Sequence, residues 1–292
     1  MGLNVGAGCG FGKQLQEIAL SGATNLLSVD LENWQGTSCR NEALYLLELF
    51  RKRNTKATFF VHSGVAEEDP DLLRQIDVEG HEIASHGCRH QSLFEMTAEE
   101  FRSDMRKSIT LLSDIVDKPI LGYRAPIFSI VEKSYWALDI LIELGIKYDS
   151  SIFPIGGARY GVPDFPRGPV RIQRGGGSIV EVPLSTARWL GRNWPVSGGG
   201  YFRLLPYSFI SRAVESVNQD GFPFVVYCHP YEFCQETLRC TRDASSLGWW
   251  KTRKTEIKTN MFRRSMRSKL SRLLERFRFC SFAEALDNEI RA

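Results

Sequence analysis

Short apolar stretches alternate with longer segments of helical periodicity along most of this chain. The stretches are rich in the branched and aromatic residues of buried strands, and they fall at Leu26–Val29, Ala57–Val61, Glu82–Ser85, Ile120–Tyr123, Ile179–Pro183, Pro223–Cys228 and Phe277–Ser281. Between them, apolar residues recur at the spacing of amphipathic helices in Asn41–Arg53, Pro70–Glu79, Ala98–Val116, Lys133–Leu144 and Tyr207–Asn218. A capping box at Thr97 and Glu100 supports the third of these helices. Strands that alternate with helices in this way predict an α/β domain with a parallel sheet.

Polar residues stand at the ends of several predicted strands. Asp30, His86, Arg124 and His229 each lie at or just beyond the C-terminal end of one. A (β/α) barrel gathers its active-site residues at this end of its strands. We therefore predict a distorted or incomplete (β/α) barrel of about seven strands. The pattern alone also allows an open, doubly wound sheet.

Two segments depart from this rhythm. Residues 1–24 contain several glycines but not the G-x-G-x-x-G spacing of a nucleotide-binding loop, so we expect a flexible lead-in. The barrel domain is then expected to cover residues 25–292. Within it, residues 184–205 are rich in Gly, Arg and aromatic residues. We expect them to form an insertion loop, which either faces the substrate or is plain surface.

The composition excludes some classes of protein and partner. The chain has 292 residues, of which 43% are hydrophobic, and its net charge of +3 is too small to indicate nucleic acid as a partner. The seven cysteines are odd in number and have no C-x-x-C spacing, so neither a zinc ribbon nor a disulfide framework is predicted. No secretory signal is visible, nor an apolar stretch of the ~18 residues that a membrane span needs. We therefore expect a cytoplasmic protein.

Residues 251–278 form a basic segment in which Lys and Arg far outnumber Glu. The Met, Phe and Leu residues among them would allow the segment to lie against the anionic inner face of a membrane. The same pattern fits a solvated helix that covers the barrel. The sequence leaves both interpretations open, and it does not indicate the oligomeric state.

The strongest local signal for chemistry is the pair His86 and His90, which follows a predicted strand. Two histidines at this spacing lie on one face of a helical turn, so both imidazoles can reach one ion. Asp30 and Glu32, at the end of another strand, point to the same face of that strand. Two histidines and one carboxylate leave coordination positions free for water and substrate, as a hydrolytic metal centre requires. Taken separately, the histidines could be surface residues and the acids could simply end a strand.

Five ordered motifs make the chain resemble the polysaccharide deacetylase family, carbohydrate esterase family four. They are SVDLENW (28–34), SHGCRH (85–90), YRAPIF (123–128), YDSSIFP (148–154) and VYCHPYE (226–232), with TFFV (58–61) in support. The forms DLENW, YRAP, DSSIFP, GGGYFRLLPY and HPYE are similar, more narrowly, to the branch associated with bacterial exopolysaccharide biosynthesis. The resemblance implies a metal-dependent hydrolase. Its substrate would be the N-acetyl group, or else the O-acetyl group, of a polysaccharide, an oligosaccharide or a lipid-linked sugar precursor.

The resemblance also implies one divalent metal ion as cofactor. Its ligands would include the two histidines of the second motif, His86 and His90. Many relatives have two adjacent Asp residues in the first motif, whereas this chain has Leu31 at the second of these positions. We therefore expect Glu32 to be the third ligand, with Asn33 as the alternative. This donor set suits Zn²⁺, which we expect, and equally Co²⁺, Ni²⁺ or Fe²⁺.

Further roles follow from the other motifs by the same resemblance. Asp30 would be the general base, and Arg124 would form an ion pair that holds it in place. His229 would be the general acid that protonates the leaving amine. Asp149 would orient either His229 or the residues around Arg124. The backbone N–H of Ile127 would stabilise the oxyanion, a task that does not depend on the side chain.

Trp34, Pro126 and Tyr201 are the residues expected to contact the acetylated carbohydrate, since aromatic rings pack on the apolar faces of sugars. Core packing is the alternative for the aromatic side chains. Two other functions are a metal-independent amidohydrolase acting on a small cyclic amide and a catalytically silent carbohydrate-binding relative. Retention of both His86 and His90 argues against the first, and the candidate base and acid argue against the second. A Ser-dependent esterase is not indicated, because no G-x-S-x-G motif occurs.

Overall fold

The computed structural model describes residues 10–20, 24–157, 160–240 and 249–290. Its strands are β1 (Leu15–Glu17), β2 (Asn25–Leu31), β3 (Thr58–Val61), β4 (Glu82–Ser85), β5 (Gly122–Tyr123), β6 (Tyr148–Asp149), β7 (Val170–Arg174), β8 (Gly177–Glu181), β9 (Thr186–Trp189), β10 (Arg192–Pro195), β11 (Val225–Cys228) and β12 (Phe279–Cys280). Its α-helices are α1 (Arg40–Lys52), α2 (Ser63–Glu68), α3 (Pro70–Val78), α4 (Ala98–Val116), α5 (Trp136–Glu143), α6 (Gly199–Leu204), α7 (Tyr207–Gln219), α8 (Trp249–Asn260), α9 (Met266–Arg276) and α10 (Phe282–Ile290).

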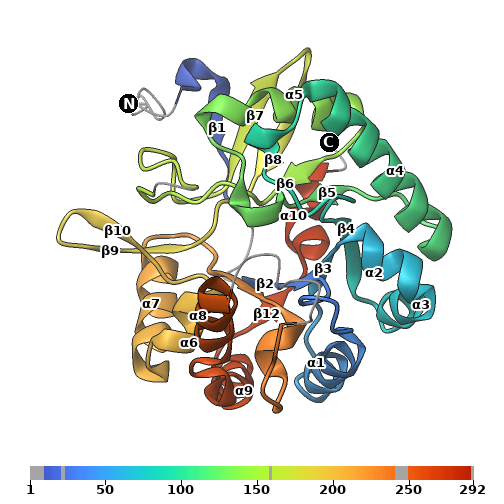
Figure 1. The fold of residues 1–292 in the computed structure, drawn as a ribbon. Coiled ribbons are helices and arrows are strands. Elements are labelled where there is room, and N and C mark those ends of the chain that lie inside the picture. Colours follow the sequence, from blue (N-terminus) through green and yellow to red (C-terminus); the bar gives the residue numbers. More distant parts are fainter. Residues whose placement is uncertain (1–9, 21–23, 158–159, 241–248, 291–292) are drawn as a thin grey trace.

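The main sheet has the order β1-β7-β8-β6-β5-β4-β3-β2-β11, with β12 also paired to β2. The pairs from β8 through β6 to β11 are parallel, and β1 and β7 add an antiparallel edge. Within the described residues the two ends of this order are not paired with each other, so the barrel is incomplete. Helices surround the curved sheet (Figure 1). The predicted α/β fold with an incomplete ring of parallel strands is therefore confirmed.

Alternation along each strand separates two cores. Leu27, Val29 and Leu31 of β2 belong to the apolar layer between the sheet and the outer helices. Leu26 instead faces the interior of the barrel, together with Phe60. Because successive side chains point to opposite faces of a strand, Ser28 and Asp30 share the interior face of β2 with Leu26. The chain therefore places an acidic group inside the barrel, at the C-terminal end of this strand.

Helix α10 fills the interior below that acidic group, and Figure 1 shows it near the middle of the ring of strands. The Phe282 ring stacks on Tyr148, with 5.5 Å between ring centroids, and meets the edge of Phe60 at 5.6 Å. Phe282 is fully buried. Burial of a large apolar side chain stabilises a fold by about 1.5–3 kcal/mol, so the packing of α10 inside the barrel stabilises the strands around it.

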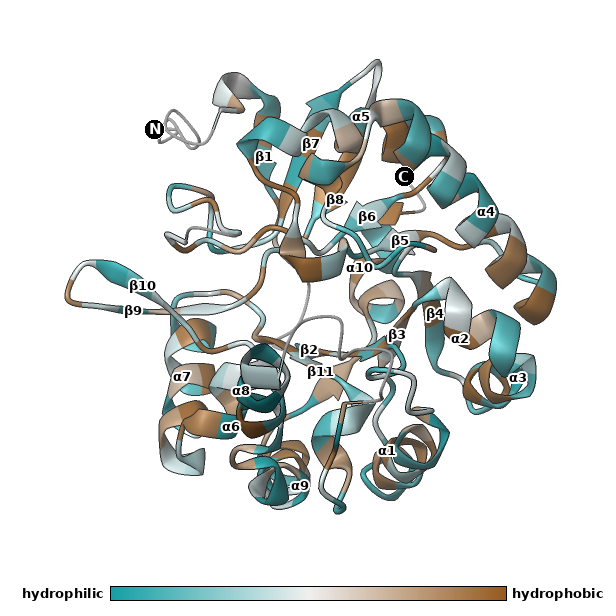
Figure 2. Ribbon diagram, viewed as in Figure 1, coloured by the Kyte–Doolittle hydropathy of each residue, from teal (hydrophilic) through white to brown (hydrophobic). Residues whose placement is uncertain are grey.

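The outer helices are amphipathic, as their periodicity predicted. Figure 2 shows hydrophilic and hydrophobic residues alternating along α1, α4 and α9. Helix α4 begins with the predicted capping box, in which Thr97 and Glu100 bond to each other's backbone N–H. None of the helices in the described part of the chain combines the length and the apolar character that a membrane crossing requires.

Several elements differ from the prediction. Residues 15–17, expected to belong to a flexible lead-in, instead form the edge strand β1, which pairs with β7; residues 1–9 and 21–23 lie outside the described residues. The expected insertion loop at 184–205 is an ordered β9–β10 hairpin followed by α6. Figure 1 shows this hairpin projecting from the molecule beside α7. Strand β6 was not predicted, because its two residues are too short to produce a pattern.

The basic segment 251–278 consists of most of α8, the whole of α9 and the turn between them. Helix α9 covers the barrel, since Met266, Leu270 and Leu273 are buried in the outer core. Helix α8 is more exposed, and Trp249 and Trp250 on its first turn retain 67% and 78% of their surface. The covering interpretation therefore holds for α9, and membrane contact stays a prediction for α8.

Candidate active site

Three predicted metal ligands come together at the C-terminal ends of the strands. One ligand atom from each of Glu32, His86 and His90 lies within 4.8 Å of the others. Glu32 directly follows β2, while both histidines follow β4, two strands along in the sheet. These residues thus come from different parts of the sequence but from the same edge of the sheet. Such a set of two imidazoles and one carboxylate is suited to a divalent metal ion.

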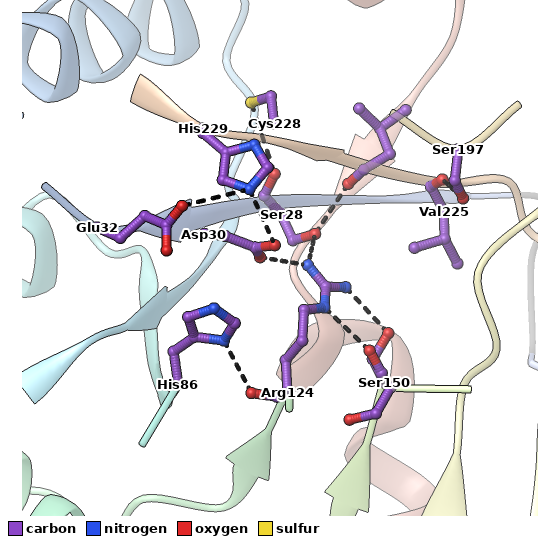
Figure 3. Close-up of polar contacts among 12 residues, drawn as sticks. Ser28, Asp30, Glu32, His86, Arg124, Ser150, Ser197, Val225, Cys228 and His229 are labelled. Carbon is purple, nitrogen blue, oxygen red and sulfur yellow. Dashed lines mark hydrogen bonds and ion pairs between the residues drawn. The ribbon is translucent and has the colours of Figure 1, made fainter. Parts of the chain in front are cut away.

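His86 is oriented by a hydrogen bond to the backbone. Its Nδ1 lies 2.8 Å from the Arg124 carbonyl oxygen, which can only accept, so Nδ1 carries the proton and Nε2 keeps its lone pair. Burial favours the neutral ring and lowers the pKa of His86 to about 4. A neutral imidazole held through its other nitrogen is the form in which histidine binds metals. Figure 3 shows the His86 ring below Asp30 and Glu32.

Glu32 and His90 lie in direct contact, with 2.5 Å between His90 Nε2 and Glu32 Oε2. Burial alone would raise the pKa of Glu32, but the hydrogen bond from His90 and the charges of the neighbouring histidines lower it to about 2. Burial likewise opposes the charged form of His90, and the carboxylate outweighs it and raises the pKa of His90. The side chain of Asn33, the alternative ligand, donates a hydrogen bond to Glu68 and accepts one from the backbone N–H of Cys39. The geometry therefore favours Glu32 over Asn33.

Asp30 lies beside this cluster in a buried ion pair. Arg124 Nη1 donates to Asp30 Oδ1 at 2.6 Å and to Ser28 Oγ at 2.7 Å. The other guanidinium nitrogens donate to the carbonyl and hydroxyl oxygens of Ser150, and the guanidinium carbon stands 4.0 Å from the centre of the Phe60 ring. Asp30 is 2% exposed and Arg124 is fully buried. Since both groups are held so firmly, the carboxylate has one fixed direction, with Oδ2 left for other partners (Figure 3).

His229 faces both acids from the end of β11. Its Nε2 lies 3.9 Å from Asp30 Oδ2 and 3.7 Å from Glu32 Oε1. On its other side, Nδ1 lies 3.4 Å from Oε2 of Glu232, which also accepts from the His229 backbone N–H at 3.0 Å. The Tyr231 ring stacks on the imidazole, with 5.1 Å between centroids. Burial opposes the charged ring, yet the Glu232 carboxylate, followed by Glu32 and Asp30, raises the pKa of His229 to about 9.

Of the two orienting roles expected of Asp149, its contacts lead toward Arg124 and not toward His229: Ser151 Oγ, which donates to Asp149, accepts from the backbone N–H of Ala125 at 2.7 Å. Asp149 accepts a hydrogen bond from Ser151 Oγ at 2.5 Å and pairs across the sheet with Glu181. Burial raises the pKa of both acids. The carboxylate beside His229 Nδ1 is that of Glu232. This residue belongs to the motif VYCHPYE, but the motif did not predict a role for it.

The other predicted site residues take varied positions. Ile127 has φ 60°, a left-handed conformation that is strained for a β-branched residue and that recurs at functional sites. Pro126 is buried. The Trp34 ring lies 6.3 Å from that of Tyr231, and thus near His229. Tyr201 instead lines a separate cavity.

We expect a Glu232→Gln variant to lower the pKa of His229 from about 9 toward the ordinary value of about 6.5. Glutamine keeps the shape of the side chain but removes the negative charge. NMR titration of the ring in metal-free protein measures this shift, with Glu236→Gln, an exposed acid in the same segment, as the control. A raised pKa stabilises the fold below pH 6.5, and this contribution is lost as the pH rises through about 9. The variant also loses the ion pair of Glu232 with Arg203 at every pH, so its loss of stability should be larger at pH 6 than at pH 10.

Comparison with known proteins covers nearly the whole chain in two parts. Residues 35–148 match the family model described as polysaccharide deacetylase. Residues 150–287 match a model described as a domain of unknown function, DUF3473. A curated peptidoglycan deacetylase of Helicobacter pylori is 34% identical over 107 residues, which are 37% of this chain and 36% of that protein. The chain thus spans about a third of the length of the first curated relatives that it matches.

Solved structures share the fold over most of the chain. A candidate polysaccharide deacetylase from Mycobacterium smegmatis has 18% identity and a TM-score of 0.60, with 94% of this chain and 93% of that chain covered. A pseudoenzyme of carbohydrate esterase family four from Bacillus anthracis has 12% identity and a TM-score of 0.52, with 91% and 66% covered. At these identities the likeness establishes the fold alone. Which chemistry the fold carries depends on the side chains.

Proposed function

We propose that this chain, which resembles the polysaccharide deacetylase family over residues 35–148, is a metal-dependent hydrolase that removes N-acetyl groups from a carbohydrate. The observation that carries this proposal is the arrangement of one candidate base, one candidate acid and three metal donors at one edge of the sheet. His229 Nε2 lies 3.9 Å from Asp30 Oδ2 and 3.7 Å from Glu32 Oε1. A general base and a general acid on either side of one reacting carbon are what hydrolysis of an amide requires.

The donor set fits a divalent ion. Glu32, His86 and His90 would hold it, and their imidazole and carboxylate ligands suit Zn²⁺ first and also Co²⁺, Ni²⁺ or Fe²⁺. When bound, such an ion lowers the pKa of water and polarises a carbonyl oxygen. Three protein ligands leave room for both water and substrate.

The side chains around this cluster supply the proton transfers. Asp30, aimed by Arg124, takes the proton of the attacking water through its free oxygen. The backbone N–H of Ile127 donates a hydrogen bond to the developing oxyanion. His229, held by Glu232, gives its proton to the nitrogen of the departing amine. No side chain of the set needs to form a covalent bond to the acetyl group.

Acetate release is the direct test of this function. The panel should contain N-acetylated oligosaccharides, N-acetylated exopolysaccharides and lipid-linked N-acetyl sugars, because the motifs resemble the branch of exopolysaccharide biosynthesis. An O-acetylated glycan serves for comparison. We expect release from at least one N-acetylated substrate, and loss of this activity after chelation. Failure to release acetate from any of them, or activity that survives complete removal of metal, would overturn the proposal.

We expect a His86→Ala variant to lose its bound metal. It removes a buried donor whose orientation is fixed by the Arg124 carbonyl, and two remaining ligands hold a divalent ion poorly. Elemental analysis after gel filtration should show about one ion per chain in the parent protein and close to none in the variant. His62→Asn is the matched control, since this ring lies 6.0 Å from that of His90 but outside the donor set. Full metal retention in His86→Ala would contradict the ligand assignment.

A further inference from the structure

A cavity lies outside the residues proposed for the chemistry. Its volume is about 1220 Å³, and its walls are the β9–β10 hairpin, residues 154–156 and 163–167, and helices α6 and α7. Sites for single small molecules usually occupy about 300–1,000 Å³, so this cavity has room for a longer ligand. All of its lining residues belong to the part of the chain that matches the domain of unknown function.

The lining combines ring faces with exposed cations. Trp194 and Phe209 retain 46% and 42% of their surface, and Tyr201 stands between them in sequence. Arg188 and Arg192 are exposed, and neither forms an ion pair with a carboxylate in the described part of the chain. These two guanidinium groups outnumber the one acid of the lining, Asp164. Arginine forks bind carboxylates and phosphates in a bidentate manner.

Helix α6 connects this cavity to the candidate active site. Its residue Tyr201 lines the cavity, while Arg203 Nε lies 3.1 Å from Glu232 Oε1, the acid that contacts His229. The helix also packs tightly on β11. A Cβ atom at Gly198 would stand 1.9 Å from the Tyr227 carbonyl oxygen, so only glycine fits there.

The opposite wall leads to the site as well. Pro154 and Ile155 line the cavity, and they follow closely on Ser150, whose oxygens hold the Arg124 guanidinium. One wall is therefore connected to Arg124, the partner of the proposed base, and the other to Glu232, the partner of the proposed acid. A chain-like ligand with one sugar at the metal donors would extend between these walls.

We propose that this cavity binds the part of an anionic polysaccharide that extends beyond the acetylated sugar in the site. The inference rests on the proposed function and names its substrate class. Aromatic faces pack on sugar rings, and Arg188 and Arg192 would pair with uronate or other acidic groups. Polar side chains such as Asn193 and Asp164 interrupt the apolar lining, whereas an acyl chain would require a continuous apolar surface. The cavity thus favours a glycan over a lipid.

Binding is measured by calorimetry on the Asp30→Asn protein, which should not turn the ligand over. The probes are a hyaluronan decasaccharide, which is N-acetylated and carries uronate groups, and a neutral N-acetylglucosamine hexasaccharide. We expect tighter binding of the anionic probe and a loss of affinity as salt rises. Adding Trp194→Ala should weaken its binding about tenfold, and adding Arg192→Glu should do so by a similar factor. Arg212→Ala, an exposed arginine of α7 outside the cavity, is the matched control and should change nothing.

Several outcomes would overturn this inference. They are no binding of either glycan, a preference for the neutral probe, or unchanged affinity in both cavity variants. If the two cavity variants lose binding to polyprenyl phosphate micelles but keep their binding of glycan, a lipid is the occupant instead. Thermal unfolding of each variant excludes a misfolded protein, and Arg192→Glu tests the charge with Trp194 intact. Failure of the proposed function is distinguishable, because acetate release and metal content are measured independently of this binding.

Discussion

An Asp30→Asn variant is expected to lose N-deacetylase activity by about 10²–10⁴-fold while it retains its metal ion. Asparagine has nearly the same shape but cannot accept a proton from water. Asp30 donates no atom to the metal cluster of Glu32, His86 and His90, so metal binding does not depend on it. Acetate release and elemental analysis of the same preparation measure the two effects.

The buried Arg124 makes a stability control necessary. Without the aspartate charge, this fully buried guanidinium loses its counter-ion, and disruption of a buried pair costs about 3–5 kcal/mol. Thermal unfolding should therefore be recorded, and activity compared at a temperature where the variant is folded. Asp139→Asn, which alters an ion pair with Arg174 outside the site, controls for the chemical change. A folded, metal-loaded Asp30→Asn protein with normal activity would mean that another group is the base.

The sequence was most informative where a residue's position along a strand determines its place in space. Alternation along β2 puts Asp30 inside the barrel, and the shared direction of parallel strands brings its end beside those of β4 and β11. Strand direction and local pattern are therefore sufficient to predict that Glu32, His86, His90 and His229 lie together. Each of these residues follows the end of a strand directly or after one short turn.

The surroundings of Asp149 could not be predicted, for a reason of the same kind. Its strand, β6, has two residues, and its neighbour in the sheet is β8, which comes after β7 in sequence. The register that places Asp149 opposite Glu181 is thus a product of pairing that no local pattern contains. Two buried acids side by side disfavour each other's charged form, and burial raises the pKa of both. The carboxylate at His229 Nδ1 is instead that of Glu232.

That carboxylate, Glu232, could have been found from local rules. It stands three residues after His229, and Pro230 begins the turn between them, so its carboxylate accepts from the backbone N–H of the histidine as in a capping box.

The edge strand β1 offered no comparable signal. Its partner β7 lies more than 150 residues away in sequence, and three residues carry too little periodicity to predict a strand. The large cavity likewise depends on how α6, α7 and the hairpin pack together.

A His229→Ala variant is expected to separate amide hydrolysis from ester hydrolysis. An amine is a poor leaving group unless it is protonated, whereas the phenolate of an aryl acetate departs with little help. His229 lies with Nε2 facing Asp30 and Glu32 and with Nδ1 against Glu232, the position from which a proton can reach a nitrogen at the metal donors. Loss of a general acid costs about 10²–10⁴-fold in rate. N-deacetylation should fall by that factor, while hydrolysis of an activated aryl acetate should stay within about tenfold of the parent.

The comparison of the two substrates within one variant is what gives this experiment its discrimination. Any general damage, such as partial unfolding or loss of metal, lowers both rates together and is detected by metal analysis. A general acid affects only the rate that depends on protonation of the leaving group. We therefore expect the ratio of kcat/KM in the parent to kcat/KM in the variant, measured for each substrate across pH 6 to 10, to be larger for the amide than for the ester. Equal loss on both would instead mean that His229 supports the metal donors or positions the substrate, and the acid would have to be another residue near the cluster.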